Sequence, residues 1–295
     1  MVIVAGNRHL RLATELSKAL NIAVIVADVK QFNDGELRVE VRADLRHQHV
    51  VILQSLPNPV NDNLITLLLM ANAIKAAGAK YLTAFVPYLG YSRQDKAAYP
   101  NGPISAHFIS KLIETSGIDR LVTVDLHSNH SKLGFQIPIH NLDPTPLFLP
   151  LLQNTDNSIV VSPDLGGVER AKKLSTLLKV DMAFIHKNRM TDGNCSMSKV
   201  VGNIKGKYCI IIDDMVDTGG TLQKSADFLL NQGAKSLKAC ITHAVCQNGF
   251  METIAKNFEK IYITDTIDRR FLSEKIEVVT MNGIVFNLFK KFFKS

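Results

Sequence analysis

Short runs of aliphatic, often β-branched residues alternate with helical segments along this chain, and no other feature restricts its fold as much. Four such runs lie at residues 50–53, 121–124, 159–161 and 209–212. Strands that are buried on both faces of a parallel sheet have this nearly continuous apolar character. Between residues 222 and 230, apolar side chains recur at positions 222, 226, 229 and 230, which is helical spacing. The alternation predicts an α/β fold built from βαβ units.

Two junctions between a predicted helix and a predicted strand are related in sequence. Residues 78–84 and 233–239 are identical at five of seven positions, and each stretch begins with a glycine that ends a helix. Helix–glycine–strand junctions are common, so the likeness has two interpretations: chance, or a duplicated α/β domain with one copy in each half. A length of 295 residues suits about two domains. Prolines at 144 and 146 mark the boundary, and we expect domains at 1–144 and 145–295.

Composition excludes several classes of protein. Hydrophobic residues make up 46% of the chain and charged residues 21%, which excludes disordered, collagen-like and coiled-coil proteins. The first residues have no basic segment typical of a signal peptide, and the longest apolar run, 64–71, is far shorter than the roughly 20 residues of a membrane span. The four cysteines form no CxxC pair, so a structural metal is not expected. We expect a soluble cytoplasmic protein. Its net charge of +7 suits anionic partners.

A buried strand, two acids and a glycine-rich loop follow one another at residues 209–221. Asp213 and Asp214 are expected to end the strand, and residues 217–221 lead into a helix. Ligands of open α/β sheets bind at the carboxyl ends of strands, and a helix N-terminus attracts phosphate. The two carboxylates could accept hydrogen bonds from the adjacent hydroxyls of a ribose. The pattern therefore indicates a site for a sugar phosphate, and the alternative is an ordinary acidic turn with a threonine N-cap.

This segment resembles the phosphoribosyl-diphosphate loop of type I phosphoribosyltransferases. Six further segments, at 32–36, 92–96, 103–106, 123–127, 161–167 and 186–189, occur in the order found in the ribose-phosphate diphosphokinases (phosphoribosyl diphosphate synthetases). The resemblance implies two tandem type I phosphoribosyltransferase-like domains, each a mainly parallel sheet flanked by helices, which agrees with the internal repeat. It assigns the ATP-side contacts to the N-terminal domain. The ribose 5-phosphate loop and a catalytic loop belong to the C-terminal domain.

The resemblance also implies the reaction and the partners. The β,γ-diphosphoryl group of ATP is transferred to the anomeric hydroxyl of ribose 5-phosphate, giving AMP and 5-phosphoribosyl 1-diphosphate for nucleotide biosynthesis, with Mg²⁺ as cofactor. Such a transfer requires mainly positioning and charge neutralisation. Two alternatives are a nucleobase phosphoribosyltransferase and a catalytically inactive regulatory homologue. We expect a homo-oligomer (a hexamer, or a dimer or tetramer) that binds neither nucleic acid nor membrane.

The resemblance assigns roles residue by residue. The catalytic cations are Lys187 and Arg189, in a polar segment, 187–199, that is similar to the mobile catalytic loop of the family. Ribose 5-phosphate is assigned Arg189, Asp213, Asp214, Asp217, Thr218, Gly219, Gly220 and Thr221. ATP is assigned Phe32, Asp34, Gly35, Glu36, Arg93 and Gln94, of which the first four reach across from a neighbouring subunit in the family. Mg²⁺ is assigned His127 and Asp164; since histidine is a poor Mg²⁺ ligand, we expect His127 to contact ATP phosphates or a metal-bound water as well.

The C-terminal tail alternates aromatic and lysine residues from Phe286 to Lys294. This pattern is typical of an amphipathic helix, which could bind a membrane or nucleic acid or could pack on the body of the protein. We favour packing, with the lysines in solvent. The helix at 284–295 is then able to pack on the N-terminal domain.

Overall fold

The chain forms two compact units. The computed structural model describes residues 1–153, 155–189, 195–246 and 249–294. Unit 1 comprises Met1–Asp143, Thr266–Asp268 and Asn282–Ser295, and unit 2 comprises Pro144–Asp265 and Arg269–Met281. The end of the chain therefore belongs to the same unit as its beginning.

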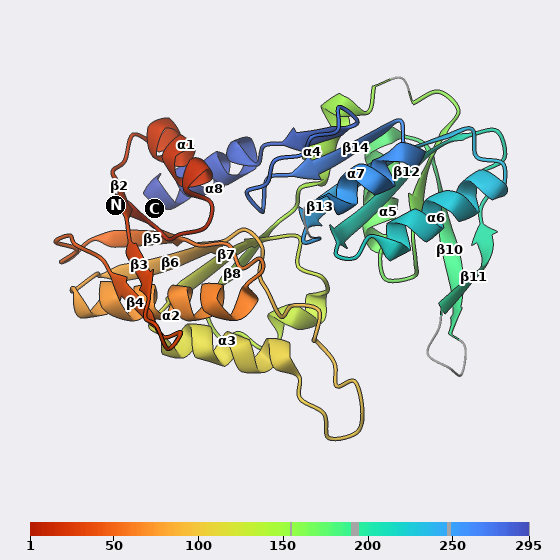
Figure 1. Cartoon of the computed structure of the whole chain (residues 1–295). Coiled ribbons are helices and arrows are strands. Elements are labelled where there is room, and N and C mark those ends of the chain that lie inside the picture. Colours follow the sequence, from red (N-terminus) through yellow and green to blue (C-terminus); the bar gives the residue numbers. More distant parts are fainter. Residues whose placement is uncertain (154, 190–194, 247–248, 295) are drawn as a thin grey trace. The chain divides into compact units, whose positions relative to one another are not determined.

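Unit 1 contains a six-stranded parallel sheet with the order β2-β1-β5-β6-β7-β8 (Figure 1). Its strands are β1 (Val2–Ala5), β2 (Val24–Val26), β5 (His49–Leu53), β6 (Tyr81–Val86), β7 (Arg120–Val124) and β8 (Ile139–Leu142). Its helices are α1 (Leu10–Leu20), α2 (Val60–Ala76), α3 (Ser105–Thr115), the short η1 (Asn129–Lys132) and the terminal α8 (Asn282–Lys294). A separate antiparallel hairpin joins β3 (Asp28–Gln31) to β4 (Leu37–Glu40).

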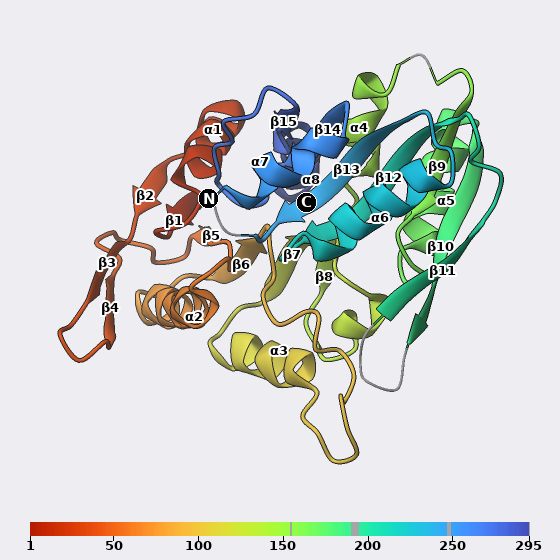
Figure 2. The same cartoon turned by 45° about the vertical axis from the view of Figure 1, so that its right-hand side comes forward.

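Helices cover both faces of this sheet, with α2 and α3 on one face and α1 and α8 on the other (Figures 1 and 2). Successive side chains of a strand point to opposite faces, so Val50 and Ile52 pack in the core with α2. Val51 and Leu53 line the opposite face together with Phe289 of α8. Phe289 is only 2% exposed, so the tail packs on unit 1. Across the described part of the chain, no helix has both the length and the apolar character needed to span a membrane.

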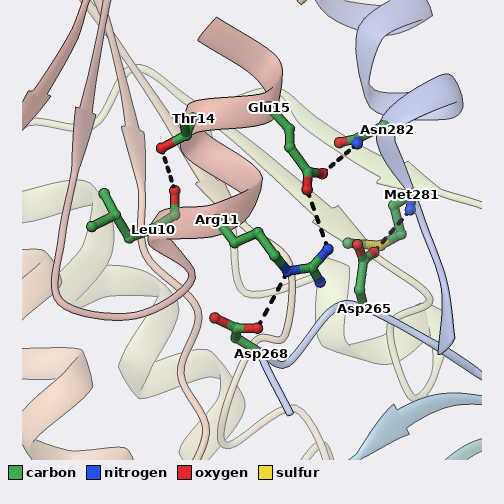
Figure 3. Close-up of polar contacts among 8 residues, drawn as sticks. All are labelled: Leu10, Arg11, Thr14, Glu15, Asp265, Asp268, Met281 and Asn282. Carbon is green, nitrogen blue, oxygen red and sulfur yellow. Dashed lines mark hydrogen bonds and ion pairs between the residues drawn. The ribbon is translucent and has the colours of Figure 1, made fainter. Parts of the chain in front are cut away.

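Polar contacts join α1 to the two later segments of unit 1, Thr266–Asp268 and Asn282–Ser295 (Figure 3). Glu15 on α1 accepts a hydrogen bond from the amide of Asn282 at 2.5 Å, and the guanidinium of Arg11 lies 3.5 Å from Asp268. Arg11 also pairs with Glu15 at 3.3 Å. Within unit 2, buried Asp265 accepts a hydrogen bond from the N–H of Met281 at 2.8 Å. These contacts hold the returning chain where α8 begins.

Unit 2 contains a seven-stranded sheet with the order β11-β10-β9-β12-β13-β14-β15, in which β11 alone is antiparallel to its neighbour. Its strands are β9 (Ser158–Ser162), β10 (Asp181–Arg189), β11 (Cys195–Val201), β12 (Tyr208–Val216), β13 (Ser236–Ala244), β14 (Lys260–Thr264) and β15 (Ile276–Val279). Its helices are α4 (Thr145–Phe148), η2 (Leu149–Leu151), α5 (Val168–Leu178), α6 (Gly220–Asn231), α7 (Phe250–Ile254) and η3 (Ala255–Asn257).

The central strand β12 is buried on both faces. Ile210 and Ile212 pack in a cluster with α4 and α5, whereas Cys209 and Ile211 pack in a second cluster with α6 and α7. The continuous apolar run at 209–212 is explained by this burial on both sides.

The two sheets repeat one topology, and the expected fold class is confirmed. The order β2-β1-β5-β6-β7-β8 in unit 1 corresponds to β10-β9-β12-β13-β14-β15 in unit 2, with β11 added at the edge. The two similar segments, 78–84 and 233–239, open the corresponding strands β6 and β13, and both Gly78 and Gly233 have positive φ, at 84° and 91°. A duplicated domain explains this correspondence, and chance does not.

Two expected boundaries were wrong. Strand β12 does not end at the two acids but continues past Asp213 and Asp214 to Val216, because its backbone stays paired with β13. The polar segment 187–199 is not a loop throughout, since its ends are the strands β10 and β11 of an antiparallel hairpin. Polar side chains suit this hairpin because it lies at the edge of the sheet, where strands carry charged residues.

Candidate active site

Three neighbouring strands of unit 2 bring chemically active side chains to one end of the sheet. The strands β10, β9 and β12 lie side by side and parallel, so their carboxyl ends meet at the same edge. Lys187 comes from β10, Asp164 follows β9, and Asp213 lies near the end of β12. The Nζ atom of Lys187 is 3.3 Å from Oδ2 of Asp164. The structure thus brings the predicted catalytic lysine to a predicted metal-binding carboxylate.

The loop after β12 leads directly into an uncapped helix. The N-cap of α6 is Gly219, with φ at +68°, which has no side chain to accept from the first turn. The first N–H groups of the helix therefore have no intrahelical acceptor and face outward with the positive end of the helix dipole. Asp217, Thr218 and Thr221 are exposed beside them. This geometry favours the phosphate-binding interpretation over a threonine-capped turn.

Asp213 and Asp214 occupy different environments. Asp214 is only 5% exposed, and one oxygen of its carboxylate lies 4.0 Å from the guanidinium of Arg170 on α5. Asp213 is partly exposed, and its Oδ1 accepts a hydrogen bond from the N–H of Asp214 at 2.9 Å. Burial and the negative charge of Asp214 raise the pKa of Asp213 well above its ordinary value. Asp213 is thus the more accessible acceptor of the two, and its charge depends on its neighbours.

Lys187 and Asp164 form a second charged pair. The side chain of Lys187 is 19% exposed and that of Asp164 is 42% exposed. Oδ1 of Asp164 accepts a hydrogen bond from the N–H of Gly167 at 3.2 Å, which fixes the carboxylate over the start of α5. A β-bulge between His186 and Lys187 shifts the pairing with β11. The side chain of Arg189, the last residue of β10, lies outside the part of the chain that the structure describes.

In unit 1, the tip of the β3–β4 hairpin carries the predicted adenine-side contacts. The N–H of Phe32 donates to the carbonyl of Glu36 at 2.8 Å, and Asp34 accepts from the N–H of Glu36 at 3.1 Å. Gly35 closes the turn with φ at +96°. The ring of Phe32 is 52% exposed. This tip presents an aromatic face and two carboxylates to solvent.

Hydrogen bonds join the two loops that follow β6 and β7 at the carboxyl end of the unit 1 sheet. Arg93 and Gln94 follow β6, and His127 follows β7; all three are exposed. The hydroxyl of Ser128 donates to Asp95, and the hydroxyl of Ser131 donates to the carbonyl of Ser92 at 2.8 Å.

The loop that carries Arg93 and Gln94 is also tied to α3. Oε1 of Gln94 accepts a hydrogen bond from Ser105 at 2.7 Å, and its carbonyl accepts from the N–H of Ala106 at 3.1 Å. Arg93, Gln94 and His127 thus lie on two loops of unit 1 that hydrogen-bond to each other.

The two residues assigned to Mg²⁺ lie in different units, His127 in unit 1 and Asp164 in unit 2, so their pairing stays a prediction. Among the described residues, no group of three or more histidine, cysteine, aspartate or glutamate side chains could hold a metal ion. Mg²⁺ usually binds one or two carboxylates, water and substrate phosphates rather than a cage of protein ligands. The partly exposed carboxylate of Asp164 fits that mode of binding.

Sequence reasoning missed Arg170. The available signal was its place: a cation in the first turn of a helix is unfavourable because it faces the positive end of the helix dipole. In the structure, one oxygen of the Asp214 carboxylate lies 4.0 Å from the guanidinium of Arg170.

Family models match both units. Residues 1–117 match the N-terminal domain of ribose phosphate pyrophosphokinase, and residues 150–266 match the phosphoribosyl transferase domain.

Individual relatives agree with these models. The chain is 40% identical to a ribose-phosphate pyrophosphokinase from Ralstonia nicotianae over 92% of this chain and 87% of the relative. It is 41% identical to one from Agrobacterium fabrum, over 90% and 87%. A crystal structure of phosphoribosylpyrophosphate synthetase from Mycobacterium smegmatis superimposes with a TM-score of 0.91 at 34% identity, covering 99% of this chain and 98% of that one.

Proposed function

Because this chain belongs to the ribose-phosphate pyrophosphokinase family, we propose that it transfers the β,γ-diphosphoryl group of ATP to ribose 5-phosphate. The anomeric oxygen attacks the β-phosphorus in line and loses its proton, the bond from that phosphorus to the oxygen that bridges it to the α-phosphorus breaks, and AMP leaves. The main support for this proposal is that Lys187, Asp164, Asp213 and the N-terminus of α6 all lie at the carboxyl ends of neighbouring strands in unit 2. The products are 5-phosphoribosyl 1-diphosphate, a precursor of nucleotides, and AMP.

The loop from Asp217 to Thr221 is the proposed site for the 5-phosphate. Its donors are the free N–H groups at the start of α6 and the exposed hydroxyls of Thr218 and Thr221. Asp213, on strand β12 before this loop, accepts hydrogen bonds from the ribose hydroxyls, while Asp214 beside it is buried. The sugar is thereby fixed at both ends, which orients its anomeric hydroxyl.

The ATP contacts belong to unit 1 in this proposal. The fork-shaped guanidinium of Arg93 suits phosphate oxygens, and Gln94 is held beside it by Ser105. Phe32 offers an exposed ring for stacking against adenine, with Asp34, Gly35 and Glu36 around it, and in this proposal they act on a neighbouring subunit of a homo-oligomer. An oligomer follows from that arrangement, and its subunit number is left open between hexamer, tetramer and dimer.

Charge neutralisation is the main chemical task of the protein. Lys187 and Arg189 are the proposed catalytic cations and stabilise the charge that develops on the transferred phosphates. Asp164, with His127 as a further contact, would hold Mg²⁺, which when bound neutralises phosphate charge. Since all substrates are small phosphorylated metabolites, we place the reaction in the cytoplasm.

Two alternative functions are not favoured. A nucleobase phosphoribosyltransferase would leave the Arg93–Gln94 loop of unit 1 without a ligand. An inactive homologue would not need Lys187 paired with Asp164 at the same end of the sheet as Asp213.

The test is an assay of AMP release from Mg²⁺-ATP with and without ribose 5-phosphate. We expect AMP to form only when the sugar is present, with no ADP as a product. Asp213→Asn should weaken sugar use, whereas Lys172→Met, at an exposed position on α5, serves as a control with normal kinetics. AMP release that is the same with and without the sugar would exclude the proposed function.

A further inference from the structure

Arg170 is a nearly buried cation beside the proposed sugar site. It lies in the first turn of α5, and its side chain is 14% exposed. Its position near the positive end of the helix dipole is unfavourable unless an anion offsets it. The carboxylate of Asp214, whose side chain is 7% exposed, lies 4.0 Å from the guanidinium and supplies that anion.

The packing of β12 explains why these two side chains meet. Even-numbered residues of β12 such as Ile210 and Ile212 face α5, and Asp214 continues this alternation. The guanidinium also passes close to Gly167, since a Cβ at that position would lie 3.9 Å from it and only 2.7 Å from the hydroxyl of Ser162. A side chain at Gly167 would therefore clash with Ser162 and contact the guanidinium of Arg170.

The contact extends from Asp214 to the sugar-binding carboxylate. The N–H of Asp214 donates to Oδ1 of Asp213 at 2.9 Å, so the position of one acid sets that of the other. The charged groups acting on Asp213 are Asp214 on its own strand, Asp164 after β9 and Arg170 on α5. Both acids raise the pKa of Asp213, and Arg170 opposes them.

We propose that Arg170 is a positioning residue for ribose 5-phosphate, acting through Asp214 to hold the carboxylate of Asp213 in place. It does not touch the substrate itself in this scheme. The inference deepens the proposed function and rests on it. Loss of the arginine charge should weaken use of the sugar specifically, because neither Asp213 nor Asp214 contributes to the ATP contacts.

The experiment compares steady-state kinetics of Arg170→Met, Arg170→Gln and Arg170→Lys in the full-length protein. We expect the KM for ribose 5-phosphate to rise at least tenfold in Arg170→Met and Arg170→Gln, with the KM for ATP within twofold of wild type. Arg170→Lys, which keeps the charge, should bring the KM for the sugar back to within about threefold. Lys172→Met, on an exposed face of the same helix, controls for loss of any α5 cation.

Three results would overturn the inference. They are a sugar KM within twofold of wild type in a folded Arg170→Gln protein, an equal rise in both KM values, and a lysine variant no better than the methionine variant. If Arg170→Met does not fold, Arg170→Gln is the deciding variant, because its neutral amide can still donate a hydrogen bond to the buried carboxylate of Asp214. A wild-type protein without sugar-dependent AMP release would refute the proposed function, whereas an active wild type with an unaffected Arg170→Gln would refute only this inference.

Discussion

Gly219 and Gly220 are adjacent in the proposed phosphate loop, yet alanine should be strongly destabilising at Gly219 and nearly neutral at Gly220. At Gly219 the backbone is left-handed, with φ at +68°, and an added Cβ would lie 2.1 Å from Cδ1 of Ile254 and 2.7 Å from Cε1 of Phe250. At Gly220 the nearest atom is Oγ1 of Thr218 at 3.6 Å, an ordinary contact.

The magnitude follows from two costs at Gly219. A left-handed alanine costs about 1–2 kcal/mol. Forcing a methyl group against packed side chains costs about 1–3 kcal/mol more. Gly219→Ala should therefore destabilise the loop and α6 by about 2–5 kcal/mol, whereas Gly220→Ala, at the first residue of α6, should change stability by less than about 1 kcal/mol.

Hydrogen exchange measured by mass spectrometry on peptides covering β12 and α6 tests this difference. Gly219→Ala should speed exchange in these peptides and raise the KM for ribose 5-phosphate, because the N–H groups of the loop move. Gly220→Ala should leave exchange unchanged. Wild-type exchange rates and a wild-type sugar KM in Gly219→Ala would show that the loop does not depend on its left-handed glycine.

Further variants and conditions test other parts of the molecule. Lys187→Ala should lower kcat by at least about 100-fold while the circular dichroism spectrum stays unchanged, and a near-normal rate would remove Lys187 from the proposed chemistry. Phe289→Ala should lower the free energy of unfolding by about 3–5 kcal/mol in urea titrations, since the ring is buried and its centroid lies 5.8 Å from that of Phe85. Lys290→Ala, at an exposed position, should change the free energy of unfolding by less than about 0.5 kcal/mol. Equal effects of the two substitutions would contradict the packing of α8. Burial and nearby Arg120 lower the pKa of His140 from its ordinary value of 6.5. The unfolded chain therefore binds more protons, and stability should fall as pH drops below about 6.5. A urea midpoint that does not change from pH 7 to 5, or one that depends on pH as steeply in His140→Gln as in wild type, would contradict this. Chelation with EDTA should abolish AMP release and added Mg²⁺ should restore it, and activity that persists in EDTA would exclude the Mg²⁺ requirement.

Local sequence patterns were sufficient for much of the fold. Uninterrupted apolar runs occur where strands are buried on both faces, and Gly78 and Gly233 take the left-handed conformations that end helices. The boundaries of β12 and of the β10–β11 hairpin were missed for one physical reason. Backbone pairing with a neighbouring strand continues past the residues whose side chains suggest a loop, and that neighbour is remote in sequence.

The sequence by itself determined the α/β class, the repeat and the candidate residues, because these depend on periodicity, on glycine positions and on motifs contained in short segments. Tertiary structure alone decided how remote segments meet. It places Phe289 of α8 against Phe85, Lys187 beside Asp164, and Arg170 near Asp214, contacts that join residues from 23 to more than 200 positions apart. No local pattern encodes such pairs, since they arise from the order of strands in a sheet and from the face that each helix covers.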